Sequence, residues 1–292
     1  MTIHSPEQIA VPLAERARNI RRLALRMGEV QGQGYIGQAL GWADVLAVAF
    51  GHAMTFRPED PMWEGRDRFL LSHGHYAIAF YAALIDAGIL PEEELETYGA
   101  DDSRLPMSGM ATYTPGMEMS GGSLGQGLTI AVGMALGLRR KRNAAFVYNS
   151  MSDGELDEGA TWEAALSASH FGLSNLVTLV DVNNQQADGH SGKMLGFEPL
   201  ADKWAAFGWH VQRVDGNDID RVRDAFDIAR GLVTPHTKGA QFPRDDQPRA
   251  ILFDTRMGKG VPFLEAREKS HFMSVEPTEW QAALAIIEDS KA

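Results

Sequence analysis

The chain alternates short, continuous apolar runs with stretches of helical periodicity. Apolar runs without polar alternation are typical of parallel strands covered on both faces, and apolar residues three and four apart predict helices packed against them. The pattern predicts an α/β fold, a doubly wound, mostly parallel sheet with helices on both faces. The expected strands are 69–72, 145–148, 176–180, 209–214 and 250–254, and the expected helices are 7–30, 41–50, 76–87, 124–139, 157–171 and 220–232.

Two segments lack this periodicity. Residues 99–118 hold three glycines, two prolines and three methionines, which predicts a long loop. Residues 234–249 are polar and rich in helix breakers, which predicts an exposed insertion. With 292 residues and 44% apolar content, the chain can bury a large core. We therefore expect residues 1–292 to form one domain with an N-terminal helical extension and a C-terminal tail.

Charge and composition narrow the class of protein. A net charge of -12 and a pI near 5.2 argue against nucleic acid or an anionic membrane as the main partner. No apolar run approaches the length of a membrane span and no signal-peptide pattern stands at the N-terminus, so we expect a soluble, cytoplasmic protein. The chain has no cysteine, which excludes disulfides, thiol catalysis and cysteine-ligated metals.

Two polar side chains follow consecutive strands of the predicted sheet. Asp153 stands after the strand at 145–148, and Asn183 stands after the strand at 176–180. A right-handed β-α-β crossover brings both strand ends to the same edge of the sheet, where ligands bind. A carboxylate, an amide oxygen and a backbone carbonyl from Gln185 would form an oxygen set that suits Mg²⁺ or Ca²⁺. The alternative is structural: Asp153 caps a helix and Asn183 shapes a turn.

Three further motifs have competing readings. The glycines of 32–37 fit the dinucleotide pattern GxGxxG, but a helical segment precedes them instead of a strand, which argues against NAD. His73 and His75 could be two ligands of a zinc site, but no further Cys or His stands at a usual zinc-ligand spacing, which argues against zinc. The glycine-rich loop 120–127 opens a helix, where backbone N–H groups favour anions, although a purely structural turn would look the same.

Several of these segments together resemble a known family. The blocks are DGELDEG at 153–159 with WEAA at 162–165, DRFLLSHGH at 67–75, PGMEMSGGSLGQG at 115–127, EPLADKWAAFG at 198–208 and TRMGKGV at 255–261. They are similar, in the same order, to the transketolase family. In detail the chain resembles the N-terminal, diphosphate-binding subunit of a split transketolase, without the pyrimidine-binding domain.

The resemblance implies a site for thiamine diphosphate and Mg²⁺ (or Ca²⁺). It places His75 and His271 at the cofactor diphosphate and the glycine-rich loop near the aminopyrimidine. The residues that follow His271 depart from the family pattern. The implied catalytic residues are His75, Tyr35 and His271, the implied metal ligands are Asp153, Asn183 and Gln185, and the implied cofactor-binding residues are His75, Gly122, Ser123, Leu124, Asp153, Gly154, Glu155, Asn183 and His271.

Two departures from the family concern the substrate. Tyr35 stands where the family has an active-site histidine, and Ser108 or Gly109 stands where it has a histidine that contacts the donor ketose. A tyrosine can donate a hydrogen bond but, with a pKa near 10, is a poor proton shuttle at neutral pH. The family reaction transfers a two-carbon ketol unit from a ketose phosphate to an aldose. We expect an unusual ketose donor or, as the alternative, an α-keto acid in a decarboxylating synthase.

The resemblance also implies a partner. In the family, a glutamate of the pyrimidine-binding domain activates the cofactor, and we expect that domain to be absent from this chain. We therefore expect a second subunit that carries the pyrimidine-binding and C-terminal domains, an α₂β₂ assembly, and transferase activity only in the complex. The rival hypothesis is a non-catalytic assembly subunit.

Overall fold

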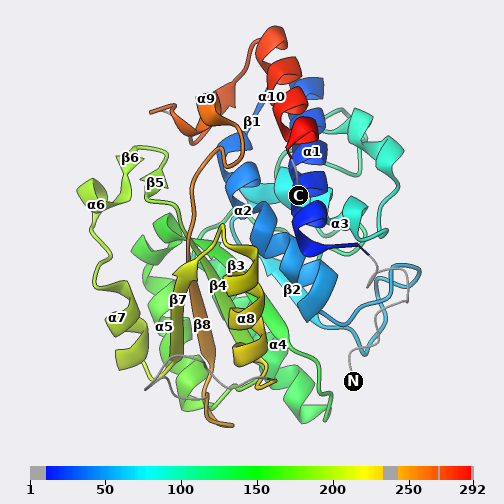
Figure 1. Ribbon diagram of the computed structural model, residues 1–292. Helices are drawn as coiled ribbons and strands as arrows, with labels where there is room; N and C mark the ends of the chain where they lie inside the picture. Colours follow the sequence, from blue (N-terminus) through cyan, green and yellow to red (C-terminus); the bar gives the residue numbers. More distant parts are fainter. Residues whose placement is uncertain (1–10, 233–242, 269, 291–292) are drawn as a thin grey trace.

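A five-stranded parallel sheet forms the centre of the computed structural model, which describes residues 11–232, 243–268 and 270–290. The strand order is β2-β3-β4-β8-β7 (Figure 1). The doubly wound parallel sheet expected from the sequence is thereby confirmed. The strands are β2 (Arg68–Leu71), β3 (Val147–Ser152), β4 (Leu176–Val182), β7 (His210–Asp215) and β8 (Arg249–Asp254).

Helices cover both faces of the sheet, and the sheet separates two hydrophobic cores. Alternate residues of each central strand point to opposite cores, as Tyr148 and Val147 do in β3. The larger core lies under α1 (Leu13–Gln31), α2 (Ile36–Val48), α3 (Ala77–Asp86), α8 (Ile219–Ala229) and α10 (Pro277–Asp289). The smaller core lies under α4 (Gln126–Arg140), α5 (Gly159–His170) and α7 (Leu200–Ala206).

Short elements occupy the connections between these helices and strands. Two-residue strands form two separate pairs: β1 (Gln33–Gly34) with β9 (Met273–Ser274), and β5 (Gln185–Gln186) with β6 (Gly189–His190). The remaining elements are the π-helix η1 (Ala49–Ala53), the 3-10 helices η2 (Gly74–Tyr76), η3 (Glu92–Thr97) and η4 (Asp153–Asp157), and the single-turn helices α6 (Ser191–Met194) and α9 (Pro262–Glu265).

Helix α2 starts five residues earlier than the sequence pattern predicts. Gly37 and Gly41 lie inside the helix, at points where other backbone segments pass close to it. A Cβ on Gly37 would come within 2.6 Å of the Ser270 carbonyl oxygen, and one on Gly41 within 2.8 Å of the Arg256 carbonyl oxygen. All 13 residues of α2 are buried, so it is a central helix of the larger core.

Other boundaries also differ from the expectation. Strand β3 continues to Ser152 because its serines are buried beside two neighbouring parallel strands, so Asp153 follows the strand directly. Helices α7 and α10 were not predicted. In both helices a buried tryptophan, Trp204 or Trp280, supplies much of the packing. The first part of the helix predicted at 7–30 and residues 234–242 of the predicted insertion lie outside the described residues.

Loop 99–118 forms no helix or strand, as expected. It is held to the core by contacts at intervals; for example, the Tyr81 hydroxyl donates to the Pro106 carbonyl oxygen at 2.9 Å. Within the described residues, no helix combines the length and apolar character that crossing a membrane requires.

Glycines of helix α4 provide a test of this packing. Gly133 and Gly137 have nothing within 4 Å of an added Cβ, whereas a Cβ on Gly127 would overlap Ser72 and come within 2.9 Å of Asn149 Oδ1. We expect Gly133→Ala or Gly137→Ala to raise the free energy of unfolding by about 0.5–1 kcal/mol, because alanine favours the helix. Gly127→Ala should lower it by roughly 1–3 kcal/mol through overpacking. Urea unfolding of the three variants measures this, and equal stabilisation by all three would contradict the packing.

Candidate functional site

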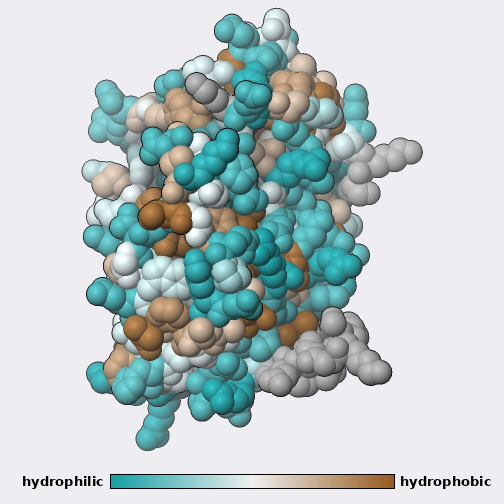
Figure 2. Space-filling model, turned by 90° about the vertical axis from the view of Figure 1, so that its left-hand side faces the viewer, coloured by the Kyte–Doolittle hydropathy of each residue, from teal (hydrophilic) through white to brown (hydrophobic). Residues whose placement is uncertain are grey.

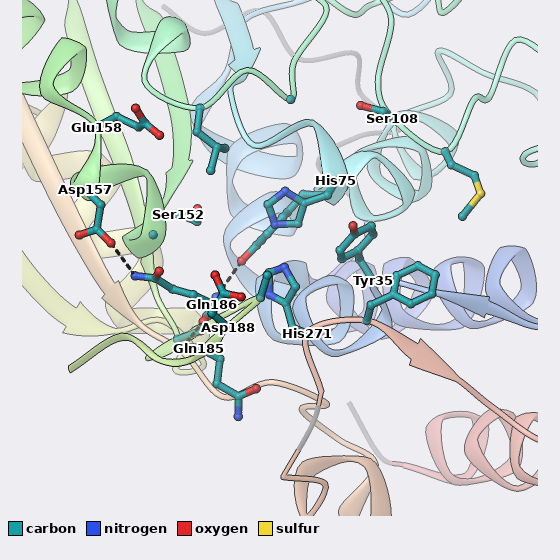
Figure 3. A pocket seen from close by; sticks show the side chains of 18 residues that line it. Tyr35, His75, Ser108, Ser152, Asp157, Glu158, Gln185, Gln186, Asp188 and His271 are labelled. Carbon is teal, nitrogen blue, oxygen red and sulfur yellow. Dashed lines mark hydrogen bonds between the residues drawn. The ribbon is translucent and has the colours of Figure 1, made fainter. Parts of the chain in front are cut away.

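A cavity of about 710 Å³ opens at the carboxyl ends of strands β3 and β4. Open parallel sheets bind ligands at this edge, because the loops that leave the strands there are free to surround a ligand. Figure 3 shows the rings of Tyr35, His75 and His271 together on one side, and Asp157 and Glu158 on the other. The remaining lining residues are Tyr76, Met107, Ser108, Gly122, Leu124, Ser152, Gly154, Asn183, Gln185, Gln186, Ala187, Asp188 and Phe272.

Asp153 is fully buried at the end of β3, immediately behind this lining. Its Oδ1 accepts a hydrogen bond from the Gly154 N–H at 2.8 Å. Its Oδ2 accepts from the Asn184 N–H at 2.9 Å and from the Ser191 hydroxyl at 3.0 Å. Burial, and then the charge of Asp181, raise the pKa of Asp153 to about 7. The three hydrogen bonds fix the orientation of the carboxylate, and its oxygens can still accept from a further partner.

Asp181 is a second buried carboxylate, at the end of the neighbouring strand. It is 1% exposed and accepts hydrogen bonds from the hydroxyls of Tyr76 and Thr255 and from Asn183 Nδ2. Because a carboxylate only accepts here, Asn183 must turn its NH₂ towards Asp181 and its Oδ1 away from it. Asn183 Oδ1 accepts from the Gln185 N–H at 2.9 Å and keeps one lone pair.

The Asp153 carboxylate is suited to a divalent cation, and Asp181 adds a second buried negative charge close by. Neither Asp153 nor Asp181 forms an ion pair with a Lys or Arg of the described chain, and buried charges are costly unless paired or bound to a metal. The described residues also contain no group of three or more His, Asp or Glu side chains arranged for a metal. A cation here would bind Asp153, Asn183 and a carbonyl oxygen, and would need further oxygens from a ligand, as Mg²⁺ commonly does.

The loop after β4 is fastened at several points. Asn184 has a left-handed φ of 61°, which places its N–H on Asp153. Gln185 lines the cavity, and its Oε1 accepts from the Ser270 hydroxyl at 2.8 Å. Gln186 donates from Nε2 to Asp157 Oδ2 at 3.0 Å, a contact drawn in Figure 3. The loop that carries the predicted metal ligands Asn183 and Gln185 is therefore bonded to the third, Asp153, at the end of β3.

The glycine-rich loop packs against the turn that carries His75. A Cβ on Gly74 would come within 2.5 Å of the Gly121 carbonyl carbon, so only glycine allows this approach. The Gly122 N–H donates to the Ser72 carbonyl oxygen at 2.9 Å. Gly122 itself has a left-handed φ of 112°. Gly122 and Leu124 line the cavity as expected, whereas the predicted residue Ser123 is exposed and outside the lining.

Glu155 was predicted to bind a cofactor, but its side chain lies behind the site. Its Oε1 accepts from the Gly125 N–H at 2.9 Å and from the Ser72 hydroxyl, and the residue is fully buried. Burial raises the pKa of Glu155 to about 7. The structure thus gives Glu155 a supporting position under the glycine-rich loop, and Gly154 is the neighbour that reaches the cavity.

Two imidazoles and two aromatic rings form one wall of the cavity. The His75 ring centroid lies 4.9 Å from Tyr35 and 5.3 Å from His271, and Phe272 lies 5.0 Å from Tyr35. Burial, followed by the charge of His271, lowers the pKa of His75 to about 3. Burial also lowers the pKa of His271. Both imidazoles are therefore neutral near pH 7, and each offers one N–H donor.

His73 has a different environment from His75. Its Nε2 lies 2.7 Å from the Ser150 hydroxyl, its ring stacks on Tyr76 at 3.7 Å, and it is fully buried. Burial lowers the pKa of His73 well below the usual range. His73 thus packs in the core beside the site.

Asp181, Tyr76, Gln186, Asp157, Glu158, Asp188 and Phe272 were not singled out from the sequence. Asp181 could have been found, because residues two apart at a strand end share a face and Asn183 was already a candidate. The others lie in loops, short helices or, for Gln186, a two-residue strand, and segments this short show no periodicity. Of the two positions left open by the resemblance, Ser108 lines the cavity and Gly109 does not.

Comparison with known proteins gives this site a family. Residues 14–284 match the family model described as transketolase, thiamine diphosphate binding domain. The chain is 68% identical to the transketolase family protein y4mO of Sinorhizobium fredii, over 95% of this chain and 96% of that protein. It is 39% identical to the 6-deoxy-6-sulfo-D-fructose transketolase subunit SqwG of Clostridium sp., over 97% and 98% of the two chains.

A solved structure agrees with these sequence matches. Transketolase from Leishmania mexicana superposes with a TM-score of 0.82 at 30% identity, over 95% of this chain. The match covers 41% of that longer protein, so the chain spans about two fifths of its length. The chain belongs to the transketolase family of transferases and corresponds to its thiamine diphosphate-binding domain.

Proposed function

We propose that this protein is one subunit of a two-subunit transketolase that depends on thiamine diphosphate and Mg²⁺. It transfers a two-carbon ketol unit from a ketose donor to an aldose acceptor. The observation that supports this most is the pair of buried carboxylates, Asp153 and Asp181, at adjacent strand ends beside a cavity of about 710 Å³. Two such charges without a cationic partner favour a divalent ion, and a diphosphate supplies the remaining ligands.

The residues of the cavity suit the two parts of the cofactor. Asp153 and the Oδ1 of Asn183, with the Gln185 carbonyl, would hold Mg²⁺. The neutral imidazoles of His75 and His271 would donate N–H groups to diphosphate oxygens. The backbone of the glycine-rich loop at Gly122 would border the ring end. When bound, thiamine diphosphate supplies a carbanion that attacks the donor carbonyl and stabilises the transferred fragment.

The cavity is chemically incomplete for an anionic sugar. The described residues that line it include no Lys or Arg, and three of them, Asp157, Glu158 and Asp188, are acidic. A phosphate or sulfonate of the substrate would be repelled by these carboxylates, by roughly 4 kcal/mol for one pair of charges 4 Å apart at an effective dielectric of about 20. We therefore propose that the cations that bind the substrate anion come from another polypeptide.

Exposed apolar side chains support a partner. Leu195, in the segment after α6, is 73% exposed, and Phe272, at the cavity wall, is 43% exposed. Figure 2, which shows the side of the molecule that carries α6 and α7, has separate hydrophobic patches on a mainly hydrophilic surface. Contiguous exposed apolar patches, unlike single apolar side chains, mark surfaces that meet another protein. We propose an α₂β₂ assembly in which the second subunit carries the pyrimidine-binding and C-terminal domains.

The donor is proposed from the groups that replace the family imidazoles. Tyr35 and Ser108 both line the cavity, and each offers a hydroxyl where a histidine stands in the family. Hydroxyls can bind donor hydroxyl groups but do not exchange protons readily at neutral pH. The similar protein SqwG is named for a sulfonated ketose, 6-deoxy-6-sulfo-D-fructose. A modified ketose is therefore the donor that we favour for this enzyme.

Removal of the metal-binding carboxylate tests the cofactor site. With the partner present, we expect the wild-type complex to bind thiamine diphosphate only when Mg²⁺ is added, as measured by titration calorimetry. Asp153→Ala should abolish this binding because the cation loses its only charged protein ligand. Asp202→Ala, an exposed carboxylate in α7, is the matched control and should leave binding unchanged. Unaltered affinity in Asp153→Ala would refute the metal assignment.

Reconstitution tests the activity and the donor. The purified chain alone should show no ketol transfer, because the groups that activate the cofactor and bind the substrate anion are on the partner. The reconstituted complex should use a sulfonated or otherwise modified ketose faster than xylulose 5-phosphate or pyruvate. Turnover is followed by detecting the released aldose or CO₂. Robust turnover by the isolated chain would contradict the split site, and preference for xylulose 5-phosphate would contradict the proposed donor.

A further inference from the structure

Helix α2 carries a buried amide that the proposed mechanism does not use. Gln38 is 1% exposed and lies in a helix in which all 13 residues are buried. Its Nε2 lies 2.8 Å from the carbonyl oxygen of His271 and 3.1 Å from the Nδ1 of the same residue. We propose that Gln38 is a positioning residue that fixes the tautomer and orientation of the His271 imidazole.

The two contacts determine which atoms carry hydrogen. A backbone carbonyl oxygen can only accept, so the NH₂ group of Gln38, and not its Oε1, must face His271. That NH₂ group has two hydrogens, one for the carbonyl oxygen and one for the ring. Nδ1 faces a donor and must itself be the acceptor. The neutral ring of His271 therefore carries its proton on Nε2.

This tautomer leaves a donor for the cavity. His271 lines the cavity, and within the described chain no residue forms a hydrogen bond with its Nε2. The ring also packs against Tyr35 in a T-shaped contact, with ring centroids 5.5 Å apart and planes at 87°. On the proposed function, which places the diphosphate here, Nε2–H is aimed at an anionic oxygen. The opposite tautomer would present a lone pair and repel that oxygen.

The Gln38 amide is kept at an energetic cost. Its Oε1 is buried and has no hydrogen-bond partner among the described residues. An unsatisfied buried acceptor destabilises the folded state by on the order of 1–3 kcal/mol. The two hydrogen bonds to His271 are the stabilising contacts that this amide makes in return. Asp44 is also a buried polar residue of α2, but its carboxylate forms an ion pair with Arg21.

A second contact restrains the same segment independently. The Ser270 hydroxyl, one residue before His271, donates to Gln185 Oε1 on the loop of the proposed metal site. Ser270 thus places the segment relative to the metal loop, and Gln38 sets the ring within it. The two restraints can be removed separately.

Nitrogen-15 NMR of the free chain tests the tautomer without cofactor or partner. The ring nitrogens of His271, identified by the signals lost in His271→Gln, should show a protonated Nε2 and an unprotonated Nδ1. Gln38→Glu has nearly the same shape but offers an acceptor to Nδ1. It should reverse the tautomer or charge the ring, an effect that loss of packing alone would not produce.

Binding of thiamine diphosphate to the complex provides the second measurement. Gln38→Leu, which removes the donor that keeps Nδ1 an acceptor, should weaken Mg²⁺-dependent binding about tenfold, the loss of one charge-assisted hydrogen bond. The matched control is Gln31→Leu, which removes a similar amide bond, from Nε2 to the Tyr98 carbonyl oxygen at 2.6 Å, away from His271. This control should retain both the His271 tautomer and the affinity.

The possible outcomes separate this inference from the proposed function. A wild-type His271 protonated on Nδ1, or an unchanged tautomer in Gln38→Glu, overturns the role of Gln38 even if the complex binds cofactor and is active. A wild-type complex that binds no thiamine diphosphate overturns the proposed function, while the NMR result on the free chain still decides the tautomer. If Gln31→Leu weakens binding as much as Gln38→Leu, the effect is general destabilisation and the inference fails.

Discussion

Two buried carboxylates at adjacent strand ends are the constraint on which the site depends. The register of β3 and β4 pairs Ser152 with Asp181, so Asp153 follows directly beside that pair. Both carboxylates are almost completely removed from water, and each must be compensated by donors. Backbone N–H groups and a serine hydroxyl surround Asp153, and two hydroxyls and an amide surround Asp181. The loop 184–191 takes its conformation from these bonds.

The rest of the cavity follows from close backbone packing. Gly74 and Gly121 lie too close for side chains, which brings the His75 turn against the glycine-rich loop. Gly37 does the same for α2 and the segment before His271. Three segments far apart in the sequence thereby place neutral imidazoles and backbone donors opposite the carboxylates. Neutral donors on one wall and acidic ligands on the other suit an anion bridged to a cation.

Much of this arrangement could be predicted from the sequence, because hydrophobic runs locate buried strands and strand ends locate ligands. The parallel sheet, the positions of Asp153 and Asn183 at its edge and the long loop 99–118 follow from such patterns. Residues that act from inside the core could not be predicted in this way. Gln38 stands in an apolar helix with no neighbour in sequence to suggest a partner, and its contact is 233 positions away at His271. Glu155 shows the reverse case, since its motif pointed to the cofactor and its side chain turns to Gly125.

The electrostatics of the chain support the proposal that its site is divided between two polypeptides. The whole chain carries a net charge of -12, and its cavity has acidic residues without a lining Lys or Arg among those described. A thiamine diphosphate could bind such a surface only through a cation on Asp153, because bare phosphate oxygens would meet carboxylates. The same negative charge disfavours the binding of a sugar phosphate or sulfonate, because these substrates bring no bound cation with them. A partner that supplies Lys or Arg side chains would then both recognise the substrate and neutralise the edge of this subunit, so assembly and substrate binding would draw on the same charges.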